Sequence, residues 1–330
     1  MYKESCTIHP EMTDFLMEKH APARVDKDAP MEYHNPVMLQ ECLEGLAIKP
    51  EGIYVDLTFG GGGHAKAILN HLKGGKLFGF DQDRDAEANA KELEGPSFQF
   101  IQANFRYLKR YLKLHKVDQV DGILADLGVS SHQFDVPERG FSTRFNAALD
   151  MRMDQSGGVT AAQVLSSYSE TDLHKILGMY GEVRNAKTLA AAIVSARMRN
   201  AIHTIEDFKV ILRKFAPRGR ENKYFAQVFQ ALRIEVNAEL QALEEMLLQC
   251  ADVMKPGARM VVMTYHSLED RLVKNFFSKG KMFGEVEKDF YGNQLRPFEP
   301  VNRKPIIARE AELSLNNRAR SAKLRVAVKV

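Results

Sequence analysis

The feature that most constrains the fold is an alternation of short apolar runs with helical segments between residues 53 and 126. The apolar runs cover residues 53–57, 77–80, 98–101 and 120–125, and helices are expected after Gly63 and from Asp85 and Asn104. This alternation is typical of an α/β fold, in which helices cover a parallel sheet. Such sheets bind ligands at the carboxyl ends of their strands, where this chain carries Asp56, Asp81 and Asp126.

After Asp126 the alternation stops, and residues 134–239 show helices and loops without a clear strand. A long helix is expected over residues 226–254, followed by a strand at 259–264, a helix at 266–277 and a closing strand at 322–330. We therefore predict one α/β domain made of residues 33–133 and 240–330. Residues 134–239 form an inserted helical domain in this interpretation.

The first 32 residues lack sustained periodicity, so we expect a mobile N-terminal extension over residues 1–32. Asn35 and Pro36 have the pattern of an N-cap followed by proline at the first helical position, which predicts a short helix to about Leu46.

Composition places the chain among ordinary globular proteins, with 45% hydrophobic and 27% charged residues in 330. No apolar stretch of about 18 residues is present, and the first residues lack the apolar core of a signal peptide, so a cytoplasmic location is expected. The three cysteines, Cys6, Cys42 and Cys250, form no CxxC pair. This spacing predicts neither a disulfide framework nor a cysteine-built zinc site.

Two segments concentrate positive charge, although the formal net charge is only +3. Residues 296–330 hold nine Lys and Arg against three Glu, a net of +6, and residues 196–224 hold eight against three acids, a net of +5. Either segment could meet phosphates, and either could be a solvated face. Charge runs alone leave these two interpretations open.

A run of four glycines, Gly60 to Gly63, lies between the first strand and the next helix. Glycines permit backbone conformations closed to other residues and let a ligand approach the main chain. Asp81 ends the next strand, where an acidic side chain can accept hydrogen bonds from both ribose hydroxyls, whereas Asp83 suits a helix cap. The pattern indicates a nucleoside-containing cofactor, with a plain flexible turn as the alternative.

Dinucleotides and S-adenosylmethionine both use this layout, and they differ in charge. A pyrophosphate seeks a helix N-terminus, whereas a positive sulfonium favours nearby carboxylates. Asp56 and Asp126 at strand ends therefore favour S-adenosylmethionine. An NAD-dependent dehydrogenase and a non-enzymatic RNA-binding assembly factor are the competing hypotheses.

Seven motifs, in order, resemble the ribosomal RNA small subunit methyltransferase H family. They are DLTFGGGGH (56–64), GFD (79–81), DGILADLGVSSHQ (121–133), ERGFS (138–142), DMRMD (150–154), HSLEDR (266–271) and NRARS (317–321). The resemblance covers roughly residues 33 to 330. It implies a Rossmann-like class I methyltransferase sheet with an inserted, mainly helical domain that recognises the RNA substrate.

The activity that this resemblance implies is methyl transfer from S-adenosylmethionine to the exocyclic N4 of one cytidine in bacterial 16S ribosomal RNA, within the small ribosomal subunit. The cofactor contacts carried over by motif are Gly62, Gly63, His64, Asp81, Phe105, Asp126 and Gln133. Two of these have structural alternatives. Phe105 could cover adenine or pack in the core, and His64 could bind the cofactor or cap its helix.

Chemistry at a cytosine amine needs an oxygen acceptor, because the N4 lone pair is delocalised into the ring. Asp126 follows the fourth strand, so it or a neighbouring main-chain carbonyl would orient the amine. His266 would line the cytosine pocket, or Ser267 with Asp270 would cap the helix instead. Methylation at C5 would need a cysteine nucleophile, and no cysteine lies near these motifs.

The DMRMD motif is too acidic to bind phosphate directly, so we expect ion pairs of Arg139 or Arg152 to fold the insertion back onto the site. Two separated carboxylates, Asp150 and Asp154, supply few ligands for a hard cation. No metal is therefore expected.

Overall fold

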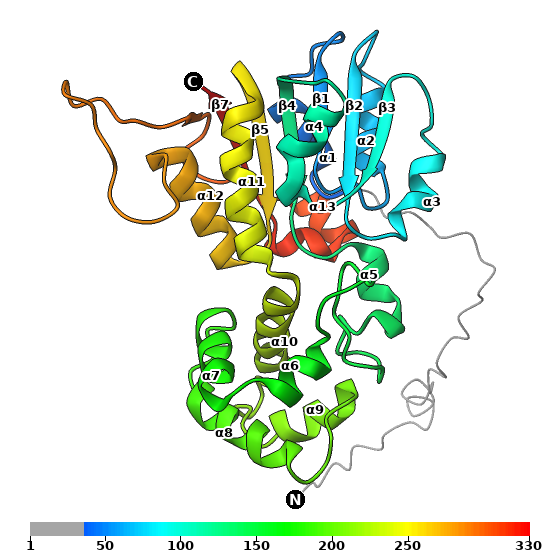
Figure 1. Cartoon of the computed structure of the whole chain (residues 1–330), viewed down its shortest axis with the longest axis vertical. Helices are drawn as coiled ribbons and strands as arrows, with labels where there is room; N and C mark the ends of the chain where they lie inside the picture. The colour runs from blue at the N-terminus through cyan, green and yellow to red at the C-terminus, as the bar shows by residue number, and fades with distance from the viewer. Residues whose placement is uncertain (1–35) are drawn as a thin grey trace, which may run out of the picture. The chain divides into compact units, whose positions relative to one another are not determined.

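The computed structural model of the chain describes residues 36–330, which belong to one compact unit (Figure 1). The predicted extension, residues 1–32, lies outside the described residues, as does Asn35. Within the described part, no helix combines the length and apolar character that crossing a membrane requires.

A seven-stranded sheet forms the centre of this unit, with the strand order β3-β2-β1-β4-β5-β7-β6. Its strands are β1 (Ile53–Asp56), β2 (Lys76–Asp81), β3 (Phe98–Gln102), β4 (Val120–Asp126), β5 (Met254–Thr264), β6 (Phe298–Pro300) and β7 (Lys323–Lys329). The first five run parallel, while β7 pairs antiparallel with both β5 and β6. The parallel α/β sheet that the alternation predicts is therefore confirmed.

Helices cover both faces of the sheet. They are α1 (Leu39–Leu46), α2 (Gly63–Leu69), α3 (Ala86–Lys91), α4 (Leu108–Leu114), α11 (Glu239–Val253), α12 (Ser267–Lys279) and α13 (Glu310–Leu315). Because side chains alternate across a strand, Val55 and Ile123 face a core built with α4, α11 and α12. Tyr54 and Leu124 face the opposite core, built with α1, α2 and α3.

The segment between β4 and β5 has its own hydrophobic cluster, running from Phe141 to Leu232. Its helices are α5 (Ser131–Asp135), α6 (Ala161–Ser167), α7 (Glu170–Met179), α8 (Ala186–Arg197), α9 (Ile205–Leu212) and α10 (Glu221–Asn237). The helical content expected for residues 134–239 is therefore present. That this segment acts as a separate domain for RNA recognition stays a prediction.

Two expected helices differ from the structure. The long helix predicted over residues 226–254 is two helices, α10 and α11, because Ala238 between them has a left-handed backbone (φ 47°). The first helix begins at Leu39 instead of Pro36, after Met38 in the same conformation (φ 50°). Neither turn contains a glycine, so the sequence carried no ordinary signal for them.

Gly140 follows α5 within the helical segment, at a position where the backbone is closely packed. Its φ is +74°, and a Cβ there would lie 2.5 Å from the Ala148 carbonyl oxygen and 2.8 Å from the Asp150 nitrogen. Gly140→Ala should lower the free energy of unfolding by about 2–4 kcal/mol, because left-handed strain adds to an overpacked backbone contact. Urea denaturation measures this loss.

The matched control is Gly157→Ala, since a Cβ at Gly157 would meet open space. We expect it to change the free energy of unfolding by less than about 1 kcal/mol. Equal losses in the two variants would contradict the assignment of a close backbone contact to Gly140.

Candidate functional site

The glycine loop after β1 needs its glycines for both conformation and space. Gly60 (φ 50°) and Gly62 (φ 76°) have left-handed backbones, and Gly62 is the N-cap of α2. A Cβ at Gly63 would lie 2.4 Å from the Pro36 ring. His64 lies inside α2, so the alternative that it caps this helix is wrong.

The His64 ring is buried, and its Nε2 lies 3.1 Å from the Val37 carbonyl oxygen. Burial lowers the pKa of His64 to about 4, so the ring is neutral near pH 7. This ring anchors α2 to the segment before α1. A cofactor contact by His64, together with those of Gly62 and Gly63, stays a prediction.

Asp81, at the end of β2, holds the glycine loop through its carboxylate. Its Oδ2 accepts a hydrogen bond from the Gly60 nitrogen (2.7 Å), and its Oδ1 accepts one from the Asp83 nitrogen (2.8 Å). Burial raises the pKa of Asp81 to about 6. Each carboxylate oxygen has a further lone pair, so Asp81 retains acceptor capacity for a ribose hydroxyl.

Asp83 joins this loop to the start of the helical segment. Its Oδ2 accepts hydrogen bonds from Gln133 Nε2 and Arg139 Nη1, both at 2.7 Å. Asp85 stands at the N-cap position of α3 but makes no side-chain cap hydrogen bond, whereas Asp83 Oδ1 accepts from the Asp85 nitrogen at 3.1 Å. Asp83 therefore caps the turn that leads into α3 and not its first residue. Gln133, predicted to contact the cofactor, also completes the capping box of α5 with Ser130.

Arg139 forms an ion pair with Asp83 that links the helical segment to the sheet. Only 3% of its surface is exposed, and its Nη2 donates to the carbonyl oxygens of Arg152 and Met153. Arg152 instead pairs with Asp150 inside the same motif. The expected link through Arg139 or Arg152 is thus made by Arg139.

Phe105 begins a short 3-10 helix (Phe105–Tyr107) after β3. Its ring is partly buried and packs against the core on one face of the sheet. Arg106 next to it makes a bidentate ion pair with Glu245 of α11 (2.6 and 2.7 Å), which fixes this turn. Core packing is therefore part of the role of Phe105, and its contact with adenine stays a prediction.

Two carboxylates, the buried Asp56 and the partly buried Asp126, end the adjacent strands β1 and β4. Asp56 is 1% exposed, and its Oδ2 has no hydrogen-bond partner among the residues that the structure describes. Burial, together with the charge of Asp81 on Asp56 and of Asp56 on Asp126, raises the pKa of each group to about 7. Buried carboxylates with an open acceptor suit a cationic ligand.

Tyr265 is a site residue that the sequence analysis missed. Its hydroxyl donates to Asp126 Oδ1 at 2.7 Å, and its main-chain nitrogen donates to Glu269 Oε2 at 3.0 Å. A Cβ on Gly128 would lie 3.4 Å from the Tyr265 ring, so the loop after β4 packs closely against it. Its place directly after β5, at the same sheet edge as Asp126, was the available signal.

His266 caps α12, and Glu269 completes the capping box. The predicted alternative, a cap by Ser267 with Asp270, is therefore wrong by one residue. The His266 side chain is 9% exposed, and its Nε2 lies 3.0 Å from Glu269 Oε1. Its role in a cytosine pocket stays a prediction.

Among the described residues, Glu239, His266 and Glu269 offer ligand atoms within 4.8 Å of one another. Arg233 binds both carboxylate oxygens of Glu239, at 2.8 and 2.9 Å. His266 and Glu269 form the cap of α12, and Glu239 is the partner of Arg233, so each of the three side chains has a structural role. Asp150 and Asp154, the sequence candidates, bind Arg152 and Ser156.

Both cysteines in the described part are buried. Burial raises the pKa of both the Cys42 and Cys250 thiols, which disfavours the nucleophilic thiolate. Cys42 also lies close enough to Asp126 and Asp56 for their charges to raise the pKa of its thiol further. Cys6 lies outside the described residues.

These features together define a class of protein. A parallel sheet with a glycine loop after β1 and acids at the ends of β1, β2 and β4, in a chain that matches a methylase family, is a Rossmann-like class I methyltransferase that uses S-adenosylmethionine. Residues 31–330 match the MraW methylase family, and the chain belongs to this family. The competing dehydrogenase and non-enzymatic hypotheses are thereby excluded.

Curated relatives include proteins named ribosomal RNA small subunit methyltransferase H. The one from Cytophaga hutchinsonii is 60% identical over 295 residues, which cover 89% of this chain and 99% of that protein. The one from Amoebophilus asiaticus is 54% identical over 294 residues, covering 89% and 95%. A solved putative rRNA methylase from Clostridium thermocellum is 12% identical, with a TM-score of 0.42 over 90% of this chain and 99% of that one.

The raised pKa values predict how cofactor binding depends on pH. Asp56 and Asp126 are protonated below about pH 7, and only their ionised forms attract a sulfonium. The dissociation constant of S-adenosylmethionine should therefore rise as the pH falls from 8 to 5.5, by roughly ten-fold or more. Isothermal calorimetry at several pH values measures it.

S-adenosylhomocysteine is the matched ligand, because it differs by a neutral thioether in place of the sulfonium. Its affinity should change less over the same pH range. The same pH dependence for both ligands would remove the two carboxylates from the sulfonium site.

Proposed function

We propose that this protein transfers the methyl group of S-adenosylmethionine to the exocyclic N4 of a cytidine in bacterial 16S ribosomal RNA, within the small ribosomal subunit. Support for the RNA comes from the curated relatives, whose printed name assigns them to small-subunit ribosomal RNA. The observation that carries the amine chemistry is the partly buried Asp126 carboxylate, held by Tyr265 at the end of β4. The substrate agrees with the cytoplasmic location that the sequence predicts.

The proposed methyl transfer needs one hydrogen-bond acceptor that orients the cytosine N4 amine. The cofactor supplies an electrophilic methyl on a positively charged sulfur. Tyr265 binds Asp126 Oδ1, so Oδ2 is the oxygen that would accept an N–H from cytosine and draw its lone pair out of conjugation. Asp126 acts here by positioning, and a neighbouring main-chain carbonyl remains the alternative acceptor.

The cofactor would be held by the predicted contacts around it. Asp81 would accept from the ribose, the main chain at Gly62 and Gly63 would let the cofactor approach, and Gln133 would close the site from α5. Asp56 would face the cationic end of the cofactor.

Basic side chains of the helical segment would bind the phosphates of the RNA. Lys214, Arg218, Arg220 and Lys223 are exposed in and beside the loop between α9 and α10, and none makes an ion pair within residues 36–330. Unpaired lysines and arginines of this kind bind phosphates and release counterions. We place the main RNA path over this loop.

Two arginines of the C-terminal basic run make ion pairs within the protein. Arg318 pairs with Asp135 at 2.6 Å, and Arg325 makes a bidentate pair with Asp270. Arg325 is also only 7% exposed. These two arginines hold the C-terminal segment in place. That the run also meets RNA phosphates stays a prediction.

Asp126→Asn tests the positioning role. The amide keeps an oxygen but loses the charge, so the single-turnover rate of methyl transfer should fall by about 10²-fold, while RNA affinity changes little. Rapid-quench measurement with radiolabelled cofactor gives the rate. Asp118→Asn, the same change at an exposed residue before β4, is the control and should leave the rate intact.

A direct test of the nucleobase position uses ribosomal RNA from cells with and without the protein. Mass-spectrometric mapping should find one N4-methylcytidine in the small-subunit RNA that disappears with the protein. A lost methyl at C5, on a ribose or in the large-subunit RNA would overturn the proposal.

A further inference from the structure

A hairpin after α12 displays two aromatic side chains to solvent. Phe290 is 97% exposed and Tyr291 is 86% exposed, and their rings meet edge-to-face with centroids 5.6 Å apart. Side chains of this size are rarely left so open at neighbouring positions without a binding role. We call residues 288–294 the aromatic hairpin.

The backbone of the aromatic hairpin is held by its own hydrogen bonds. The Asp289 carboxylate accepts from the main-chain nitrogens of Tyr291 and Asn293 and from Asn293 Nδ2, at 2.8–2.9 Å. Lys288 and Gln294 pair across the hairpin as a β-bridge. The two rings therefore sit on a fixed turn, which lowers the entropic cost of binding a ligand on them.

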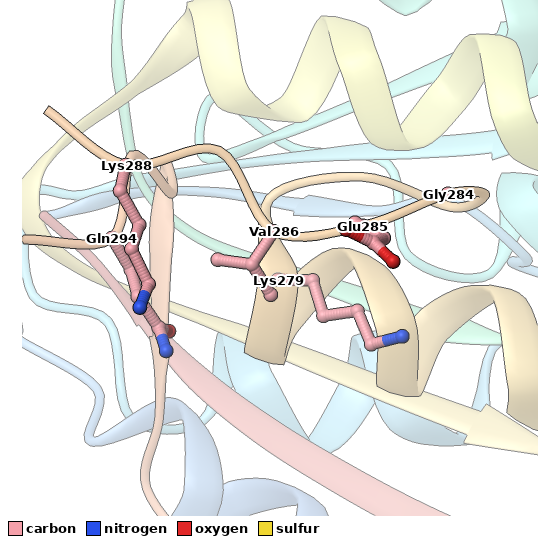
Figure 2. A pocket seen from close by; sticks show the side chains of 6 residues that line it. All are labelled: Lys279, Gly284, Glu285, Val286, Lys288 and Gln294. Carbon is pink, nitrogen blue, oxygen red and sulfur yellow. The ribbon is translucent and has the colours of Figure 1, made fainter. Parts of the chain in front are cut away.

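Two lysines come from the hairpin and from the helix before it: Lys288 belongs to the aromatic hairpin, and Lys279 ends α12. A groove of about 440 Å³ is lined by Lys279 from the end of α12 and by Lys288 and Gln294 from the hairpin (Figure 2). Neither lysine makes an ion pair with any described residue. Three acids lie near these lysines in the sequence. Glu287 pairs with Lys281, and the Asp289 carboxylate accepts hydrogen bonds within the hairpin turn. Glu285 lines the groove itself.

Exposed rings beside unpaired lysines match the chemistry of unpaired nucleotides. Every base can stack on an aromatic ring, and the adjoining phosphates are attracted to ammonium groups. We infer that the aromatic hairpin binds a single-stranded RNA segment, with bases on Phe290 and Tyr291 and phosphates at Lys279 and Lys288. The inference deepens the proposed function, on which its choice of RNA rests.

The hairpin is a docking contact separate from the candidate catalytic centre. Helix α12 begins beside His266 at the sheet edge and runs 13 residues to Lys279, about 20 Å of helix. RNA held by the hairpin would therefore be a segment distant from the target cytidine. A contact of this kind selects the surrounding RNA and leaves the base pocket untouched.

The test exploits a chain without tryptophan. Tyr291→Trp places one indole on the hairpin, and its fluorescence should be quenched when a twelve-nucleotide single-stranded RNA is added to the full-length protein. Duplex RNA of the same sequence should quench much less, because its bases are already stacked. Absence of quenching by the single strand would overturn the inference.

A second variant measures the affinity. Phe290→Ala with Tyr291→Ala should weaken binding of the single strand by roughly 25-fold or more, since each stacked base is expected to contribute at least about five-fold. Leu114→Ala, at another exposed apolar residue, is the control and should bind as the unaltered protein does. Calorimetry with S-adenosylmethionine checks that both variants are folded.

Lysine variants complete the test. Lys279→Gln with Lys288→Gln should reduce the slope of log affinity against log salt by about 0.7 for each lost phosphate contact. An unchanged slope together with unchanged affinity in the alanine variant would overturn the inference, as would quenching by ribosomal proteins and not by RNA.

The outcomes separate this inference from the proposed function. If the mapped RNA lacks N4-methylcytidine dependent on this protein while the hairpin still binds single strands, the proposed function fails and the inference stands. If methylation is found and the aromatic variant keeps its RNA affinity, the reverse holds.

Discussion

The buried ion pair between Asp83 and Arg139 is the interaction on which the rest of the arrangement depends. It joins the loop after β2 to the start of the helical segment, and Gln133 shares the same carboxylate oxygen. A buried charge left without its partner costs several kcal/mol, so both partners must be present for either element to stay in place. The positions of the loop after β2 and of the helical segment are thereby tied to one contact.

Asp81 connects the Asp83 turn to the glycine loop. Its carboxylate binds the Gly60 nitrogen on one side and the Asp83 nitrogen on the other, so the glycine loop and the Asp83 turn share one acceptor. Burial raises the pKa of Asp56, Asp81 and Asp126, which makes their ionised forms costly in the protein alone. A cationic ligand bound at this sheet edge would offset that cost.

The sequence predicted the parts of this structure that depend on local pattern. Strands β1 to β5 and the glycine loop follow from apolar periodicity and from backbone freedom at Gly60 and Gly62. The break at Ala238 did not, because an alanine in a left-handed conformation is imposed by packing and carries no local signal. The cap of α12 was misplaced because His266 with Glu269 and Ser267 with Asp270 have the same three-residue spacing.

Interactions between distant residues were harder to predict, and they decide which charges are available. Arg318 lies 183 residues from Asp135 in the chain, and Tyr265 lies 139 residues from Asp126, so no local pattern reveals either pair. Counting charge along the sequence therefore misses that Arg318 and Arg325 pair with Asp135 and Asp270, two carboxylates that also pair with Arg144 and Lys323.

Cations without an ion-pair partner lose no contact within the protein when a phosphate replaces their counterions, so we expect them to contribute most to RNA binding. The exposed loop between α9 and α10 and the two lysines beside the aromatic hairpin carry such cations. They belong to different parts of the fold, one in the helical segment and one after α12. An RNA that meets both must be extended or folded across the protein, and a short strand can reach only one.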